Sequence, residues 1–285
     1  MPTRTIYTTS EVTIGAATSS VLGSAHLVSA VTSATFTMDT PREQVTVFGK
    51  KGQIATVQNE STSSTIEIVF HPYANVTGLE GPDPTDTADA DFLTPADLQL
   101  LMNDAALDNP TGETIVVAGV GKLTAALLTS ITAEGSVGAL PTITLGFDGN
   151  GTVDASSVSP DASSYNIANM ENVSIDSVGA GGNTTSYAQT ASFNWEMPIE
   201  KLNKLGNSVE SATTYGTPPG TASISVEGMD SSGAVTGVNF GAWLLKLDSD
   251  SKQSNVTNNM AVGEVGATFN TTTEGVADGC VATNA

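Results

Sequence analysis

The chain is poor in the side chains on which most catalytic and metal sites depend. Its 285 residues include one cysteine, two histidines and nine lysines or arginines, and only 5% are aromatic. The single cysteine, Cys280, excludes an intrachain disulfide framework. Two histidines and one distant cysteine also provide no set of zinc ligands at a standard spacing. We therefore expect no metal site, no cofactor and no enzymatic activity.

Basic residues are especially scarce, since nine of them oppose 30 acidic residues and give a net charge of −21. Stable binding to nucleic acid depends on Lys and Arg that replace counterions along phosphates, so it is not expected here. The same charge argues against binding to anionic membranes. The longest apolar stretch, Ile115 to Leu128, is interrupted by glycine and lysine and is too short to span a bilayer.

The N-terminus lacks the apolar run of a secretory signal, so we expect synthesis in the cytoplasm. An excess of acidic residues also suits a halophilic or marine source, where salt screens acidic surfaces. Serine and threonine together number 69, and glycine adds 28. A composition rich in Thr, Val and Gly favours a β protein with many turns.

One segment of the chain occurs twice. SATFTMDTPREQVTVFGK (33–50) aligns without a gap with TASFNWEMPIEKLNKLGN (190–207), at a constant offset of 157 residues. An alternating pattern that is typical of a strand follows each copy, around Ile66 and around Ile224. The identical pairs are Ala34 and Ala191, Phe36 and Phe193, Pro41 and Pro198, Glu43 and Glu200, and Gly49 and Gly206.

Each copy has the pattern of a strand, a proline that ends it, a short mixed segment and a glycine. Proline cannot donate to a central ladder, and glycine suits a position that needs positive φ. A polar loop (50–64 and 207–221) and a return strand follow. Further alternating runs precede the copies at 11–14 and 172–175. The pattern predicts two homologous domains, 1–155 and 156–285, joined by a linker at 148–164 that is poor in apolar residues.

One helix is well indicated. Thr94 is a good N-cap, Pro95 fits the first helical position, Asp97 complements the helix dipole and Asn109-Pro110 would end the helix. Between these two ends, apolar residues recur with the spacing of one helix face: Leu98, Leu101, Met102 and Ala105. The segment 240–247 is a weaker helix candidate or a buried strand. Further strands are expected at 114–119, 140–147 and 262–270. The predicted fold is mainly β, with two tandem sandwich or barrel domains and about one flanking helix in each.

Four catalytic or ligand-binding patterns are incomplete. The stretch 118–124 lacks the first glycine and the hydroxyl residue of a phosphate loop. A calcium loop that begins at Asp148 lacks its twelfth ligand. The acidic run 83–91 is interpreted as a solvated loop before the helix, with weak binding of a cation as the alternative. His26 and His71 lie outside any recognisable catalytic setting, and His71 precedes a proline at the end of a strand.

The second copy, with its polar loop and the return strand TASISVEG, resembles the signature stretch of major tail tube proteins of long-tailed phages and archaeal tailed viruses. That family has a strand, then a segment of the type x-P-I-x-x-L-x-x-L-G, a loop and a returning strand. The matching positions are Pro198, Ile199, Leu202, Leu205 and Gly206. The first copy matches more loosely, at Pro41, Val45, Phe48 and Gly49.

The resemblance implies a β-sandwich whose inner sheet joins those of its neighbours into a continuous barrel. It implies the two-domain branch of the family, in which three chains form a ring with pseudo-six-fold symmetry. Stacked rings would form the hollow tail tube of a virion, through which genomic DNA passes without stable binding. The implied partners are other copies of the chain, a tape measure protein, and the tail terminator and baseplate proteins.

Two groups of residues carry structural expectations. Val45 and Phe48, like Leu202 and Leu205, should be buried, where they would seal one end of a sandwich or a seam between subunits. The acids Glu67 and Glu227, on the return strands, face either the lumen or the outside, since a two-residue period alone does not identify the face.

Two other functional classes compete with the tail tube. One is a different structural virion protein, such as a capsid decoration or baseplate component, which has no need of the duplicated strand-proline-glycine unit. The other is a surface adhesin or glycan-binding β protein, for which a secretion signal or an anchor would be expected.

Overall fold

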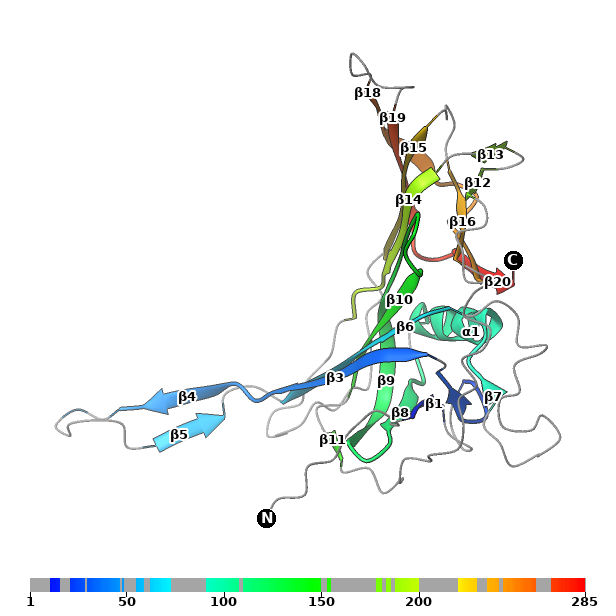
Figure 1. Cartoon of the computed structure of the whole chain (residues 1–285). Helices are drawn as coiled ribbons and strands as arrows, with labels where there is room; N and C mark the ends of the chain where they lie inside the picture. The colour runs from blue at the N-terminus through cyan, green and yellow to red at the C-terminus, as the bar shows by residue number, and fades with distance from the viewer. Residues whose placement is uncertain are drawn as a thin grey trace.

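The computed structural model describes residues 11–15, 21–28, 30–46, 48, 55–58, 62–72, 91–107, 110–149, 153–154, 178–180, 183–185, 188–199, 220–229, 235–240, 243–259 and 268–284. Within these ranges the chain is mainly β, as predicted, and contains one helix (Figure 1). None of the helical residues in these ranges forms a segment long and apolar enough to cross a membrane.

One antiparallel sheet of eight strands forms the main layer. Its strand order is β3–β6–β10–β9–β14–β15–β19–β18. The strands are β3 (Val31–Asp39), β6 (Ser63–Phe70), β10 (Thr142–Asp148), β9 (Gly121–Ser136), β14 (Ala188–Glu196), β15 (Thr221–Met229), β19 (Thr268–Val276) and β18 (Lys252–Asn259).

A second layer covers one face of this sheet, and β9 belongs to both layers because it is long. Its first residues pair with β8 and β11, and its later residues pair with β10 and β14. β8 (Glu113–Val117) and β11 (Val153–Asp154) lie on opposite sides of β9. Beyond β8 follow β1 (Val12–Ile14), β2 (His26–Leu27) and β7 (Asp91–Phe92). A separate sheet has the order β13 (Asn183–Thr185), β12 (Val178–Ala180), β16 (Gly237–Phe240), β17 (Trp243–Lys246) and β20 (Val281–Asn284).

The hydrophobic core lies between the two layers. Every second residue of the central strands points into it, and Phe193 and Trp195 of β14 are almost completely buried. The rings of Phe70 and Trp243 meet edge to face across the layers, with centroids 5.5 Å apart. The indole Nε1 of Trp195 donates to the carbonyl oxygen of Ala277 at 3.0 Å, so this buried polar group is satisfied.

The helix α1 (Pro95–Ala105) confirms the prediction from its cap residues. Thr94 accepts from the backbone N–H of Asp97, and the Asp97 carboxylate accepts from the backbone N–H of Thr94, which is a capping box. The helix ends at Ala105, earlier than Asn109-Pro110. Gln99 ties it to β20, since its side-chain amide donates to the Cys280 carbonyl oxygen and its Oε1 accepts from the N–H of Ala282.

The structure corrects several sequence-based expectations. The segment 240–247 is not a helix: it contains the end of β16 and all of β17, and burial alternates along β17 with a two-residue period. In the described part of the second half there is no flanking helix. The expected linker 148–164 begins inside β10, and its β11 pairs with β9. Of the strand expected at 262–270, the residues 262–267 lie outside the described ranges, and 268–270 belong to β19, which continues to Val276. The segment 172–175 lies outside the described residues.

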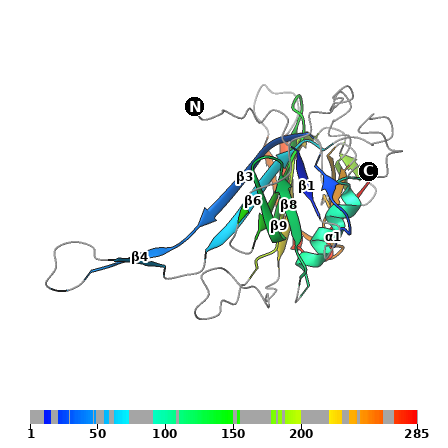
Figure 2. The same ribbon diagram turned by 90° about the horizontal axis from the view of Figure 1, so that it is seen from below.

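Two strands form an arm that projects from the rest of the chain. Among the described strands, β4 (Arg42–Val45) and β5 (Ala55–Gln58) pair only with each other and form a sheet of their own. Figures 1 and 2, which are related by a 90° turn, both show this ribbon extending away from the layers, beyond the ends of β3 and β6. The expected loop 50–64 is therefore partly strand.

Candidate assembly edges and polar sheet face

The face of the eight-stranded sheet that is turned away from the core is polar. Its side chains alternate with the buried ones along each strand, and Ser, Thr, Asn and Glu predominate. The described strand residues place seven carboxylates and one lysine on this face. They are Asp39, Glu67, Glu134, Asp148, Glu196, Glu227, Glu274 and Lys252.

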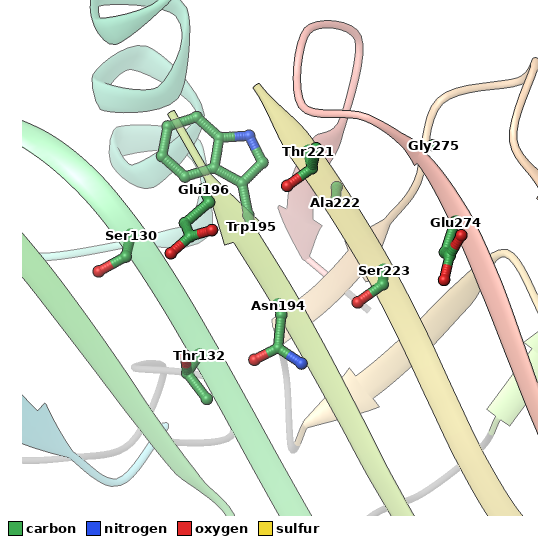
Figure 3. A pocket seen from close by; sticks show the side chains of 10 residues that line it. All are labelled: Ser130, Thr132, Asn194, Trp195, Glu196, Thr221, Ala222, Ser223, Glu274 and Gly275. Atoms are coloured by element: carbon green, nitrogen blue, oxygen red, sulfur yellow. The ribbon is translucent and has the colours of Figure 1, made fainter. Parts of the chain in front are cut away.

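The carboxylates on this face are separated from one another. Glu67 pairs with Thr35 and Gly146, and Glu227 pairs with Thr190 and Asn270. In a shallow depression of the same face, Glu196 and Glu274 are separated by β15 and are surrounded by Ser, Thr and Asn side chains (Figure 3). Like charges directly opposite each other destabilise a sheet, and this spacing avoids such pairs. The face of Glu67 and Glu227, which sequence alone left open, is therefore the solvent-exposed face.

The sheet consists of two runs of four strands with the same arrangement. The first run has the order β3–β6–β10–β9, and the second has the order β14–β15–β19–β18. In both runs, the first two strands of the sheet follow the order of the sequence. The last two strands stand in the reverse order, so the strand that comes later in the sequence lies third in the sheet. β9 and β14 pair with each other and join the two runs. We call this pairing the internal seam.

The registers of the two runs also agree. Phe36 pairs with Ile66, and Phe193 pairs with Ile224. A register shift interrupts β3 between Val31 and Ser33, and another interrupts β14 between Ala188 and Thr190. Because these two pairs of residues are related by the same offset of 157 as the repeated sequence, the first bulge occupies the same place in each run.

A second bulge recurs at the other side of each run. Thr129 is the extra residue of β9, and Ser254 is the extra residue of β18. The hydroxyl of Thr129 donates to the carbonyl oxygen of Gly146 at 3.1 Å. The hydroxyl of Ser254 donates to the carbonyl oxygen of Thr272 at 3.3 Å. Each acceptor lies on the partner strand at the bulge, so the same local hydrogen bond is made twice.

The internal seam is a continuous, buried junction. Trp195 pairs with Ile131, and their side chains are 1% and 0% exposed. Beyond the last paired residues, the N–H of Met197 donates to the carbonyl oxygen of Thr129 at 2.9 Å. At the opposite end, the N–H of Val137 donates to the carbonyl oxygen of Gln189 at 2.9 Å. Both runs therefore share one ladder and one core.

Among the described strands, the two outer ones of the sheet, β3 and β18, are free edges. β3 corresponds to β14, and β18 corresponds to β9, which are the two strands that form the internal seam. Met38 of β3 is 59% exposed and Val256 of β18 is 47% exposed. Long edges with exposed apolar side chains invite pairing with another strand, and proteins that remain monomeric usually protect them.

The structure describes part of the family-like motif. Pro41 follows the end of β3, and Pro198 follows the end of β14, as a strand-ending proline should. Phe48 is completely exposed at the arm, and Val45 is half-buried, so neither seals the sandwich of its own chain. That prediction is wrong for the single chain because 42–45 form a projecting strand. Ile199 is half-buried. Gly49, Leu202, Leu205 and Gly206 lie outside the described residues, as does the acidic run 83–90.

The structure places a serine and a carboxylate beside His26, a setting that the sequence did not reveal. Its Nε2 lies 3.1 Å from the Ser24 hydroxyl, and its Nδ1 lies 3.5 Å from Asp97 Oδ2. The second distance is too long for a good hydrogen bond. Asp97 Oδ2 also accepts from the N–H and the hydroxyl of Thr94, at 2.8 and 2.6 Å. The carboxylate therefore belongs to the helix cap and does not orient a catalytic imidazole.

The second histidine, His71, makes a hydrogen bond that connects two strands. His71 Nδ1 donates to the carbonyl oxygen of Pro141 at 2.8 Å, which ties the end of β6 to the start of β10.

Within the described ranges, no three His, Cys, Asp or Glu side chains are grouped so that they could hold a metal ion. Comparison with protein families and with curated proteins finds no match to this chain.

The residues that define the edges have no conspicuous signal in the sequence. The bulge residues Thr129 and Ser254 are two among 69 serines and threonines. The strand β18, KQSNVTNN, has no alternation of apolar and polar residues because it is exposed along its described length. Once β9 is aligned with β18 through the bulge, the match between Ile131 and Val256 becomes visible.

Trp195→Ala tests the internal seam. Loss of this buried side chain should lower the free energy of unfolding by about 3–5 kcal/mol, because a large cavity would remain between the two runs. Met38→Ala, at the corresponding position of the free edge, should change it by less than about 0.5 kcal/mol. Urea unfolding of the unassembled protein measures both values, and equal losses would contradict the assignment of Met38 to an open edge.

Proposed function

We propose that this chain is a structural virion protein, the major tube subunit of a viral tail. Copies of the chain join edge to edge into closed rings, and the rings stack into a hollow tube through which genomic DNA passes. The observation that supports this proposal most directly is the eight-stranded sheet. Its free edges, β3 and β18, are the counterparts of the two strands that already pair in the internal seam.

A head-to-tail contact of this kind closes into a ring when the rotation from copy to copy is a simple fraction of a turn. Each chain provides two four-strand runs, which we assign to two tail-tube-type domains, 1–155 and 156–285. Three chains then contribute three times eight strands, and the ring has six similar seams. Three of these seams are internal, and three lie between chains, so the symmetry is three-fold and pseudo-six-fold.

The polar face of the sheet is the face that lines the lumen in this proposal. The second layer and the core occupy the opposite face, which leaves this one open to solvent. It carries seven carboxylates and one lysine among its described strand residues, Glu67 and Glu227 included. A negative, hydroxyl-rich wall gives DNA phosphates no cations with which to pair, so DNA can move past without stable binding. A tape measure protein would occupy the lumen before DNA release.

The projecting arm is suited to contacts between stacked rings. An isolated two-stranded ribbon is marginally stable in water, so β4 and β5 gain stability when they dock on another surface. The arm exposes Phe48 and Arg42. The segment 40–61 has three basic residues against two acidic ones, so it is slightly basic in a chain whose net charge is −21. This difference favours docking of the arm on the acidic body of a neighbouring copy. Terminator and baseplate proteins would cap the ends of the tube.

Electron microscopy of the purified protein tests the proposed function. We expect tubes or rings, and class averages should show three chains and six similar lobes in each ring. Six full chains in each ring would contradict the assignment of two domains to one chain. A protein that remains monomeric at high concentration, or that binds glycans as a monomer, would contradict the tail tube and favour a decoration protein or an adhesin.

The salt dependence of assembly tests the acidic lumen. Ring closure brings the carboxylates of the polar face toward one another, so assembly should become more complete as ionic strength rises from about 0.01 to 0.15 M, where the screening length falls from about 30 to 8 Å. The double variant Glu67→Gln/Glu227→Gln should weaken this dependence. Its control is Asp250→Asn/Asp278→Asn, which removes the same charge from exposed turns outside the eight-stranded sheet. Sedimentation measures the assembled fraction, and an equal effect of both variants would contradict the claim.

A further inference from the structure

We infer that β18 of one copy pairs with β3 of the next copy in the register of the internal seam, with Thr37 opposite Thr257 and Met38 opposite Val256. This inference rests on the proposed function and names the partner surface residue by residue. The partner is a second copy of this chain. The inference follows from the two bulges, which fix how the strands of the two runs correspond.

β3 corresponds to β14 residue by residue. Their first bulges coincide at an offset of 157, as do the pairs Phe36–Ile66 and Phe193–Ile224. Thr37 therefore corresponds to Asn194, and Met38 corresponds to Trp195.

β9 corresponds to β18 in the same way. Gly146 pairs with Ser130 just after the bulge of β9, and Thr272 pairs with Asn255 just after the bulge of β18. The hydroxyl bonds of Thr129 and Ser254 mark the same place. Thr132 therefore corresponds to Thr257, at an offset of 125 residues.

The internal register can now be transferred to the free edges. In the internal seam Asn194 pairs with Thr132, and Trp195 pairs with Ile131. The transfer places these residues of β3 and β18 opposite each other: Phe36 and Asn258, Thr37 and Thr257, Met38 and Val256, and Asp39 and Asn255. The N–H of Thr40 would donate to the carbonyl oxygen of Ser254, as the N–H of Met197 does to that of Thr129.

The exposed apolar side chains support this register over its neighbours. Met38 and Val256 are large apolar residues left exposed on the two edges, and they fall on the positions of the buried pair Trp195 and Ile131. A shift by one residue would turn one of the two away from the core and would place a polar side chain there. Only the transferred register, or a shift by an even number of residues, keeps both side chains on the core side.

A second copy is the occupant that the edges themselves specify. β3 has nine residues and β18 has eight, and neither contains proline. Among the described strands, each lacks on its free side the neighbour that its counterpart has in the internal seam. One chain carries both complementary edges, so a single kind of subunit satisfies all of them when the ring closes. Pairing of β3 with β3, or of β18 with β18, would instead give a two-fold dimer.

Cysteine cross-linking tests the register. Thr37 and Thr257 are exposed on the polar face. Their counterparts in the internal seam, Asn194 and Thr132, form a non-hydrogen-bonded pair of the antiparallel ladder. The Cα atoms of such a pair lie about 4.5 Å apart, and a disulfide fits between them. The variant Thr37→Cys/Thr257→Cys, oxidised after assembly, should give chains linked to one another, ending in a closed three-chain species on a non-reducing gel. The native Cys280 should contribute little, because burial raises the pKa of its thiol to about 11.

Three controls define the result. Thr132→Cys/Asn194→Cys, at the internal seam, should form a disulfide within one chain. Thr37→Cys/Asn255→Cys, two residues out of register, should cross-link at least about tenfold less because the separation grows to about 7 Å. The single variant Thr37→Cys should not cross-link.

The outcomes separate this inference from the proposed function. Rings of the double variant that form without a disulfide between positions 37 and 257, or that link equally well out of register, overturn the register but leave the tube. Linkage through the single Thr37→Cys variant shows β3 pairing with itself and overturns the head-to-tail contact. Failure of the wild-type chain to assemble at all contradicts both.

A substitution provides a second measurement that needs no oxidation. Met38→Asp should raise the concentration required for assembly at least about tenfold, because the seam would bury a charge. Val137→Asp is its control, since Val137 is 76% exposed and lies in a turn beyond β9. The unassembled Met38→Asp protein should unfold at the same urea concentration as the wild type. Normal assembly of this variant would overturn the placement of Met38 in the seam.

Discussion

The hydrogen bonds at the edges of one β-sheet are the constraint on which the rest of this structure depends. Each backbone N–H and C=O needs a partner or water, and an open sheet always leaves two strands with one side unpaired. Here the sheet joins two similar runs through β9 and β14, and its outer strands are the counterparts of that junction. The fold thus contains one completed example of the contact and the two halves of another. In the proposed ring neither edge would stay free, and the exposed Met38 and Val256 would be covered by the neighbouring strand.

Charge acts in opposite directions in this arrangement. The carboxylates of the polar face make the surface unattractive to phosphates, which suits a conduit for DNA. In the proposed ring the same carboxylates would repel one another, so the seams would have to provide enough stability to offset that repulsion. The spacing of Glu67 and Glu227 among uncharged neighbours reduces the repulsion within each chain. Between chains of the proposed ring, salt would reduce it further.

The sequence predicts some elements well because their signals are local. The helix α1 follows from Thr94, Pro95 and Asp97, and the ends of β3 and β14 follow from Pro41 and Pro198. Elements that depend on tertiary context are not predictable in this way. The helix alternative for β17 is wrong because a short, nearly continuous apolar run fits either structure. β18 lacks any alternation, since its described side chains are exposed on both faces of the strand. Burial of Phe48 within its own chain is wrong because the projecting arm has no signature in composition, and its burial at a seam between subunits stays a prediction.

Amide hydrogen exchange, followed by mass spectrometry before and after assembly, tests the central claim most directly. In the unassembled chain, the outward N–H groups of β3 and β18 should exchange rapidly, whereas those of β9 and β14 should be protected by the internal seam. Assembly should protect β3 and β18 to the level of β9 and β14 and should leave the latter pair unchanged. If tubes form while the amides of β3 and β18 continue to exchange rapidly, the chains do not join through these edges, and edge-to-edge assembly is wrong.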